Sequence, residues 1–261
     1  MFVGGKGLNQ SIALARAGAD VCHVGCIGKD GDVLRQALEK NGVNTSFIEQ
    51  VDGPSGHAII EVDSKGENSI VLYGGANQKN NADSISRVFK HISEGEFVLI
   101  QNEINGIPEI IKQGTKVKCQ IVFNPAPMST EVMNYPLQKV DYFILNQSEA
   151  EAMTGYNEPN EMLRQLHKQF PHSKIVLTLG SQGAIYKDAK QQIFTDAVLT
   201  VALDTTGAGD TFIGYFLAEM CQKESIHQAL KIASKAASHC IQKAGAADSI
   251  PFRSELRPIP G

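Results

Sequence analysis

Short apolar runs alternate with helical patterns through most of the chain. From about residue 83 onward, these runs lack polar alternation, which is typical of strands buried on both faces of a parallel sheet. The expected strands span residues 97–101, 119–123, 142–145 and 174–179, and the expected helices span 82–92, 108–113, 149–153 and 161–170. The pattern therefore predicts an α/β protein with a mostly parallel sheet flanked by helices, and ligands at the carboxyl ends of the strands.

The two ends of the chain add further elements. The first part predicts a helix to about residue 17, a buried strand at 21–27, a helix at 30–41 and a short strand at 46–50. Runs at 57–63 and 68–73 flank Ser64-Lys65-Gly66 and indicate a β-hairpin. Later come a hairpin-like pair at 183–187 and 192–194, an extended run at 194–203, and helices at 212–220 and 225–241. No linker interrupts the pattern, so residues 1–261 are expected to form one domain with a small β appendage at about 55–77.

Composition and charge narrow the functional class. The net charge of −4 gives no basic surface for nucleic acid, so nucleic acid is not expected as a partner. Five cysteines without a regular spacing indicate a reducing compartment, and Cys22 and Cys26 are expected to pack rather than bind metal. There is no apolar stretch of transmembrane length and no signal-peptide layout. A cytoplasmic protein with no membrane partner is expected.

The segment at residues 204–212, with the sequence DTTGAGDTF, carries the clearest chemistry. Gly207 and Gly209 flank Ala208, and this spacing lets the backbone bring its N–H groups close to an anion. The helix that follows adds unpaired N–H groups and the positive end of its dipole. Asp210, in the first helical turn, could accept the proton of a hydroxyl that attacks a phosphate. The alternative is an ordinary strand-to-helix turn with an aspartate near the N-cap.

Two familiar nucleotide-binding motifs do not fit the glycine-rich segments. Gly4-Gly5-Lys6-Gly7 resembles half of a P-loop, but no Ser or Thr follows the lysine. Gly207-Ala208-Gly209 is followed by Phe212 where a dinucleotide-binding fingerprint has its third glycine. A Walker-type phosphate loop and a dinucleotide oxidoreductase are therefore not expected.

Six motifs follow one another from Gly4 to Pro251. They are GGKGxNQ at 4–10, GEN…GGAN at 66–77, NPAP at 124–127, NxxEAE at 146–151, TLGSxG at 178–183 and DTTGAGDTF at 204–212. In this order, the chain resembles the ribokinase-like (phosphofructokinase-B-type) sugar kinases over nearly its whole length. The resemblance implies a three-layer ribokinase-like fold, incomplete at the N-terminus, with a small β lid to which the hairpin at about 55–77 belongs.

The resemblance also implies roles for the catalytic and sugar-binding residues. Asp210 would be the general base when a sugar hydroxyl attacks the γ-phosphate of ATP. The amides of Gly207, Ala208 and Gly209 would form an anion hole for the transferred group. The sugar would be held by Asp210 together with Gly5, Lys6, Asn9 and Glu103, since polyol hydroxyls both donate and accept hydrogen bonds.

Nucleotide and metal positions follow from the same resemblance. Asn146 and Glu149 would organise Mg²⁺ and the phosphates, largely through water. The residues expected to line the ATP site are Thr178, Gly180, Ser181, Gly183, Gly209 and Ser234. An activating monovalent cation, K⁺, would be bound at Asp204 and Ser249, with backbone oxygens from Thr206, Cys240, Lys243 and Gly245. Three alternatives stay open: Asn146 only caps its helix, Lys6 is a solvated side chain, and Asp204 is a second capping aspartate.

The chain departs from the family at its start. Family members carry several tens of residues before GGKG, including the first sheet strand, part of the lid and a sugar-contacting aspartate. Here only Met1, Phe2 and Val3 precede Gly4. The absence of that strand is expected to expose two strand edges. The absence of the aspartate is expected to weaken sugar binding by about 1.5–3 kcal/mol.

Two functions are compatible with these observations. The first is an ATP-dependent kinase for the primary hydroxyl of a pentose, converting ribose to ribose 5-phosphate, with deoxyribose, fructose or a nucleoside as other possible substrates. The second is a catalytically weak nucleotide- or sugar-binding protein, which the short N-terminus suggests. The lid is expected to serve also as a surface for a homodimer.

Overall fold

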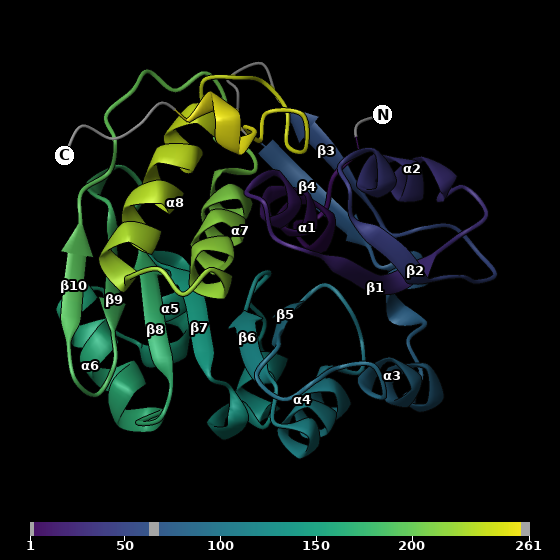
Figure 1. The fold of residues 1–261 in the computed structure, drawn as a ribbon, viewed down its shortest axis with the longest axis horizontal. Helices are drawn as coiled ribbons and strands as arrows, with labels where there is room; N and C mark the ends of the chain where they lie inside the picture. The colour runs from purple at the N-terminus through teal and green to yellow at the C-terminus, as the bar shows by residue number, and fades with distance from the viewer. Residues whose placement is uncertain (1–2, 63–67, 257–261) are drawn as a thin grey trace.

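The computed structural model describes residues 3–62 and 68–256, and a six-stranded sheet forms its centre (Figure 1). The strand order is β10-β9-β8-β7-β6-β5. The parallel strands are β5 (Phe97–Gln101), β6 (Gln120–Asn124), β7 (Tyr142–Asn146) and β8 (Lys174–Thr178). They are followed by β9 (Ala184–Lys187) and β10 (Gln192–Thr195), which pair antiparallel. The mostly parallel sheet predicted from the sequence is confirmed.

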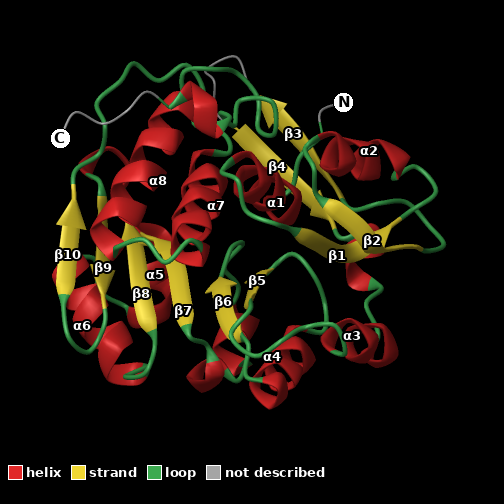
Figure 2. Ribbon diagram, viewed as in Figure 1, coloured by secondary structure: helices red, strands yellow, loops and turns green. Residues whose placement is uncertain are grey.

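Helices cover both faces of this sheet (Figure 2). One face carries α1 (Lys6–Arg16), α7 (Ala208–Cys221) and α8 (Ile226–Cys240), and the other carries α3 (Ala82–Phe89), α4 (Ile107–Val117), α5 (Gln147–Thr154) and α6 (Pro159–Gln169). Side chains of one strand alternate between the two faces. Val176 packs into the cluster with α7 and α8, while its neighbours Ile175 and Leu177 pack into the other cluster.

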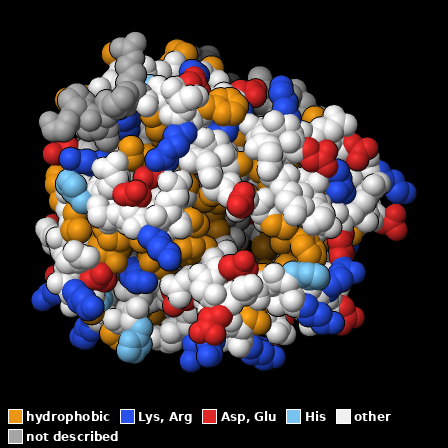
Figure 3. Space-filling model, viewed as in Figure 1, with side chains coloured by type: hydrophobic (Ala, Val, Ile, Leu, Met, Phe, Trp, Pro, Cys, Tyr) orange, Lys and Arg blue, Asp and Glu red, His pale blue; other side chains and the backbone are white. Residues whose placement is uncertain are grey.

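A second, two-stranded parallel sheet consists of β1 (Cys22–Ile27) and β2 (Asn44–Gln50), joined by α2 (Asp32–Lys40). The prediction of a buried strand at 21–27 is wrong in part, because Val24 is 45% exposed and only the end of β1 is buried. Val24 is exposed because β1 has a neighbouring strand on one side only. Among the described strands, β1 pairs only with β2, and β5 pairs only with β6. Each of these two strands therefore has one edge without a partner among the described strands, and Figure 3 shows a hollow with hydrophobic side chains on this face of the molecule.

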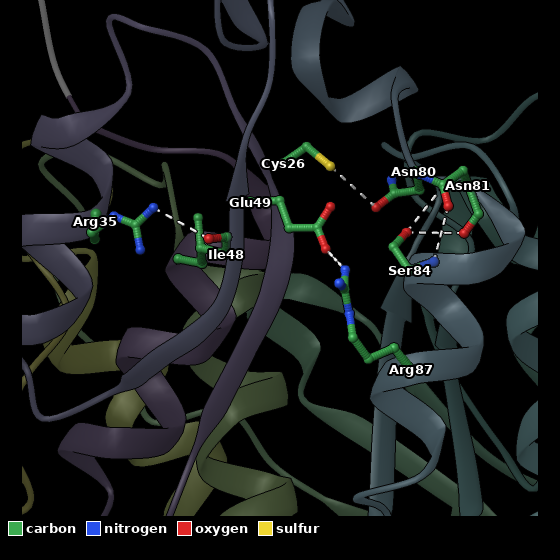
Figure 4. A network of polar contacts seen from close by, with 8 residues as sticks. All are labelled: Cys26, Arg35, Ile48, Glu49, Asn80, Asn81, Ser84 and Arg87. Atoms are coloured by element: carbon green, nitrogen blue, oxygen red, sulfur yellow. Dashed lines mark hydrogen bonds and ion pairs between the residues drawn. The ribbon is translucent and has the colours of Figure 1, made fainter.

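Polar contacts fasten the β1–β2 sheet to the segment that leads into α3 (Figure 4). The thiol of Cys26, on β1, lies 3.7 Å from Oδ1 of Asn80. Glu49, on β2, forms an ion pair with Arg87 of α3. The side chain of Asn81 caps α3 by accepting the backbone N–H of Ser84 at 2.9 Å. These contacts hold the small sheet beside the start of α3.

The predicted β-hairpin is present as β3 (His57–Val62) and β4 (Asn68–Tyr73), which pair antiparallel. The turn predicted at Ser64-Lys65-Gly66 lies outside the described residues. Ile59 and Val71 face each other across the pair and are 54% and 60% exposed. The hairpin therefore presents apolar side chains to its surroundings.

The tight approach of α1 to α7 depends on one glycine. A Cβ atom added to Gly214 of α7 would lie 2.4 Å from the Cβ of Ala13 on α1, closer than real Cβ contacts. Glycine at this position removes the side chain that would hold the two helices apart. Because α7 is buried along nearly its whole length, this contact fixes α1 against the centre of the protein.

The segment that follows β10 differs from its predicted structure. The extended run predicted at 194–203 is only partly correct, because β10 ends at Thr195 and the following segment is irregular. In that segment Leu199 and Val201 are 89% and 87% exposed, and no strand covers them within the described residues. Within the described ranges, no helix has both the length and the apolar composition to cross a bilayer.

Candidate active site

The amino-terminal end of α7 is shaped by glycine. Gly207 is the N-cap and has a φ of 80°, in the left-handed region that glycine adopts without strain. Its α-carbon also lies close to the following segment, since an added Cβ would lie 3.2 Å from the carbonyl oxygen of Ala246. The N–H of Ala208 donates to the carbonyl of Thr205 at 3.2 Å, so this amide already has a partner inside the turn. A Cβ added to Gly209 would meet no atom within 4 Å, so the turn is open at that residue.

Asp210 lies in the first turn of α7 and is buried, with 8% of its surface exposed. Each of its carboxylate oxygens accepts one amide hydrogen bond from α1. Nδ2 of Asn9 donates to Oδ2 at 2.9 Å, and Nε2 of Gln10 donates to Oδ1 at 2.8 Å. Burial raises the pKa of Asp210, while the charge of Lys6 and these two hydrogen bonds act in the opposite direction. A buried carboxylate with a raised pKa is suited to accept a proton.

The predicted sugar-binding residues lie around this carboxylate. The backbone N–H of Lys6 donates to Oε2 of Glu103 at 2.9 Å, and an added Cβ on Gly5 would lie 3.9 Å from the same oxygen. Burial raises the pKa of Glu103, and the nearby Asp210 charge adds to this, whereas Lys6 lowers it. The structure therefore brings Gly5, Lys6, Asn9, Glu103 and Asp210 together.

One buried atom at this site has no partner. Oδ1 of Asn9 is buried and accepts no hydrogen bond, although Nδ2 of the same amide is bound to Asp210. A buried acceptor without a partner costs free energy unless a ligand or water donates to it. A sugar hydroxyl has the required donor, so this atom fits the predicted sugar site.

A chain of side-chain amide groups continues from Asp210 into the sheet, and no role was predicted for these groups. Gln10 is fully buried, accepts from Nε2 of Gln101 at 2.6 Å, and lies 3.3 Å from Oδ1 of Asn124. Asn124, at the end of β6, donates to the carbonyl of Ile144 at 2.9 Å. Gln10 and Asn124 stand inside the GGKGxNQ and NPAP motifs, which was the only signal available for them.

Asn146 and Glu149 form a capping box at the start of α5. Oδ1 of Asn146 accepts the backbone N–H of Glu149 at 2.9 Å, and the Glu149 carboxylate accepts the backbone N–H of Asn146 at 3.0 Å. The capping role considered for Asn146 is thus present. Glu149 is buried and its pKa is raised by burial, and it also feels the charges of Lys6 and Asp210. This carboxylate therefore belongs to the same electrostatic cluster.

The predicted nucleotide residues lie on the connection between β8 and β9 and on α8. Gly183 has a φ of 114°, and an added Cβ would lie 2.0 Å from the carbonyl oxygen of Thr195. Thr195 in turn lines a cavity of about 420 Å³, whose other lining residues are Phe194, Asp196, Ala197, Val198, His227, Lys231 and Lys235. Thr178 ends β8, Gly180 and Ser181 form the following 3₁₀ turn, and Ser234 is buried on α8.

The cavity residues on α8 were missed by the sequence reasoning. His227, Lys231 and Lys235 recur every four residues, which places them on one face of the helix beside the apolar stripe. That spacing was a usable signal for a polar functional face. The residues Phe194 to Val198 gave no comparable signal, because they read as an extended apolar run.

The residues expected to bind a monovalent cation also gather in one place. The carboxylate of Asp204 accepts the backbone N–H groups of Thr206 and Gly245, each at 2.9 Å. Hydrogen bonds from Thr206 and Gly245 hold the pKa of Asp204 below its usual range. The Cys240 thiol lies 3.7 Å from the carbonyl oxygen of Thr206 and 3.1 Å from the hydroxyl of Ser249. The Lys243 side chain pairs with Glu255 at 2.8 Å, and the backbone N–H of Lys243 donates to the carbonyl of Cys240 at 3.1 Å.

The donors near Asp204 suit an alkali cation better than a transition metal. They are a carboxylate, a hydroxyl and backbone carbonyls, which are the oxygen donors that hard cations prefer. In residues 3–62 and 68–256, no three His, Cys, Asp or Glu side chains form a metal-binding group. The oxygen donors around Asp204 fit the monovalent cation expected at these positions.

Comparison with known proteins then decides the family. The model of the pfkB family carbohydrate kinases matches residues 1–253. The chain belongs to this family. Ribokinase from Staphylococcus aureus is 34% identical over 269 residues, which cover 99% of this chain and 88% of that protein. A deoxyribokinase from Salmonella typhi is 31% identical over 259 residues, which cover 95% of this chain and 84% of that protein.

A solved structure agrees with this pfkB-family assignment. The structure of Arabidopsis thaliana ribokinase complexed with ribose and ATP matches with a TM-score of 0.88 at 29% identity, covering 97% of this chain and 86% of that one. The ribokinase-like fold and the carbohydrate kinase class expected from the sequence are confirmed. The dinucleotide oxidoreductase and P-loop alternatives remain excluded.

Proposed function

We propose that this pfkB-family protein transfers the γ-phosphate of ATP to the primary hydroxyl of ribose, giving ribose 5-phosphate and ADP. The observation that carries the proposal is the buried Asp210 carboxylate at the open amino-terminal turn of α7, surrounded by polyol-binding side chains. The proposal is supported by the similar ribokinase that was solved with ribose and ATP.

Asp210 is the general base in this reaction. The ribose hydroxyl gives its proton to the Asp210 carboxylate while its oxygen forms a bond to the γ-phosphorus, and the bond between the γ-phosphorus and the β–γ bridging oxygen breaks. ADP leaves with the electron pair of that bond. The raised pKa of Asp210 makes it a better proton acceptor than an exposed aspartate. Amides of Gly207 and Gly209 together with the α7 dipole stabilise the negative charge on the transferred group.

The sugar site uses the groups that surround Asp210. Oδ1 of Asn9, which lacks a partner, accepts a ribose hydroxyl, and Glu103 accepts another. Lys6 contributes positive charge near the carboxylates of Asp210 and Glu103. This combination of acceptors and one cation suits a polyol that enters next to a phosphate.

The nucleotide occupies the other side of the α7 turn. Its base enters the cavity between the β10 end and α8, beside Val198 and His227, and its phosphates approach the turn at Gly180 and Ser181. Mg²⁺ neutralises phosphate charge when bound, and the oxygen atoms of Asn146 and Glu149 fit such an ion through water. The proposed K⁺ site is the group around Asp204, three positions before Gly207 in the chain.

Organisation and location complete the proposal. Residues 1–261 form a single ribokinase-like domain, with residues of about 55–77 as its lid. The exposed apolar pair of Ile59 and Val71 on this lid is the surface of a homodimer. The five cysteines are all free, which agrees with a reducing compartment, and we place the reaction in the cytoplasm.

An assay of ADP formation tests the function. Purified protein is incubated with ATP and Mg²⁺, with ribose, deoxyribose, fructose or no sugar, and with or without K⁺. Ribose is expected to stimulate ADP formation more than the other sugars, and K⁺ to increase the rate. Asp210→Asn is expected to lower turnover about 10²–10⁴-fold.

Three outcomes would contradict parts of this proposal. If no sugar increases the rate of ADP formation, the protein is a binding protein rather than a sugar kinase. Deoxyribose is the second candidate substrate because the chain is similar to a deoxyribokinase. A preference for deoxyribose would change the proposed substrate but not the proposed reaction. A normal rate in Asp210→Asn removes Asp210 as the base.

A further inference from the structure

We propose that Gln10 is a positioning residue for the phosphoryl transfer, because its side-chain amide holds the Asp210 carboxylate in the orientation that receives the sugar proton. The inference rests on the proposed function and adds a residue to it. Gln10 is fully buried on α1, and its Nε2 lies 2.8 Å from Oδ1 of Asp210.

The orientation of the Gln10 amide is determined by its neighbours. Its Oε1 accepts Nε2 of Gln101 at 2.6 Å, and a glutamine nitrogen can only donate such a bond. Nε2 of Gln10 must therefore face Asp210 and Asn124, to which it donates at 2.8 and 3.3 Å. Asn124 is itself anchored by its bond to the carbonyl of Ile144. The amide cannot turn over without breaking these contacts.

This fixed donor has two effects on Asp210. With Asn9 on the other oxygen, it defines the plane of the carboxylate and leaves the remaining lone pairs for the substrate. It also favours the ionised form, because hydrogen bonds to a carboxylate lower its pKa. The charged groups that face Asp210 are Lys6 of α1, Glu103 after β5 and Glu149 of α5. Lys6 lowers the pKa of Asp210, and the hydrogen bonds from Asn9 and Gln10 act in the same direction against burial.

The first test is Gln10→Met, which keeps the length of the side chain and removes its hydrogen bonds. The kcat for ribose phosphorylation is expected to fall roughly 10- to 100-fold, since small misplacements of a catalytic group are costly. The KM for ribose is expected to change less than about threefold, because Asn9, Lys6 and Glu103 remain. The acid limb of the kcat/KM profile, which reports the free enzyme, is expected to move to higher pH, because one hydrogen bond that lowers the pKa of Asp210 is lost.

The second test is Gln10→Glu, which places a carboxyl group next to Asp210. Two neighbouring carboxylates share one proton until the pH is high. The acid limb is therefore expected to move further upward than in Gln10→Met. If Gln10→Met does not fold, as judged by circular dichroism, the Gln10→Glu profile alone decides the inference.

Ser11→Ala is the matched control. Ser11 is the next residue of α1, is also buried, and bonds to His23 at 2.8 Å rather than to Asp210. Its pH profile is expected to match that of the wild type even if its stability falls. If the kcat/KM profiles of both Gln10 variants fall at acid pH where the wild-type profile does, the inference is wrong. The kinase assignment would be unaffected. Absence of sugar-stimulated turnover in the wild type would instead refute the proposed function.

Discussion

The side-chain amide of Asn9 lies 2.9 Å from the carboxylate of Asp210, although 201 residues separate the two in the chain. Asn9 belongs to the helix that follows the first glycines, and Asp210 belongs to the first turn of α7. The same amide presents an unpartnered oxygen on its other side. One short contact thus joins the residue expected to hold the sugar to the residue expected to take its proton, and it depends on how closely α1 packs against α7.

Gly214→Ala tests that dependence. The new methyl group would overlap Ala13 and push α1 away from α7, carrying Asn9 and Gln10 away from Asp210. We expect a loss of about 1–3 kcal/mol in the free energy of unfolding. We also expect a loss of roughly 10- to 100-fold in kcat/KM for ribose, measured by ADP formation. Gly25→Ala is the control, since its added Cβ would meet only His23, at an ordinary 3.7 Å.

The pH dependence of turnover follows from the burial of Asp210. A base must be ionised to accept a proton, and burial raises the pKa of Asp210 above that of an exposed aspartate. Activity is therefore expected to fall, as the pH is lowered, at a higher pH than an ordinary aspartate would give. A kcat/KM profile for ribose measures this limb. An acid limb in the range of an exposed aspartate would contradict the prediction.

Asp210→Asn is expected to increase stability while it removes activity. A carboxyl whose pKa is raised in the folded state contributes stability below its unfolded pKa, and this contribution is lost as the pH rises through the folded pKa. Asparagine has no such loss, so the variant should have the higher Tm at neutral pH. The difference should shrink as the pH approaches the ordinary aspartate range, where both proteins are uncharged at this site. A lower Tm for the variant at neutral pH would show that the hydrogen bonds to Asp210 outweigh its desolvation.

Arg16 is expected to stabilise the segment that carries Ser249. Its guanidinium donates to the carbonyl of Ala247 at 3.2 Å and to that of Ile250, and it lies 4.5 Å from the ring centre of Phe252. Arg16→Gln should lower the free energy of unfolding in urea by about 1.5–3 kcal/mol, the range for hydrogen bonds to charged groups. Arg164→Gln should change it little, because Arg164 is exposed and its ion pair is with Glu161 of its own helix.

The exposed apolar side chains of the β3–β4 hairpin are the proposed surface of a homodimer. Ile59 and Val71 lie opposite each other on the hairpin and are exposed, so a lysine at Val71 would place a charge inside a dimer interface. Val71→Lys is expected to weaken the dimer at least about tenfold, equivalent to 1.4 kcal/mol, in sedimentation equilibrium. Met133→Lys, at an exposed apolar position far along the chain, is the control. A monomeric wild-type protein would contradict the dimer proposal.

Local patterns located the sheet well. The strand expected at 97–101 is β5 with the same bounds, and that expected at 142–145 is β7 with one residue more. Both are short, continuous apolar runs, and a run of this length is typical of a buried strand rather than of a helix. β1 was less predictable, because its exposure depends on which strand lies beside it, and no local pattern contains that information.

Site residues could be predicted from the sequence only where they belong to a recognised motif. Asp210, Asn9, Lys6 and Glu103 were expected together and do lie together, although their catalytic roles stay predictions. Gln10 had no predicted role because its partners Asn124 and Asp210 are 114 and 200 residues away. A buried glutamine on a helix looks like a defect in an apolar stripe until its distant partners are known.

The separation of 201 positions between Asn9 and Asp210 also has a consequence during protein synthesis. At about 5–20 residues per second, α1 leaves the ribosome roughly 10–40 seconds before the first turn of α7 does. Throughout that interval the side of α1 that packs on α7, including Ala13, has no helix to cover it. Nascent chains of this protein therefore offer chaperones a long window for binding, which closes only when α7 has emerged.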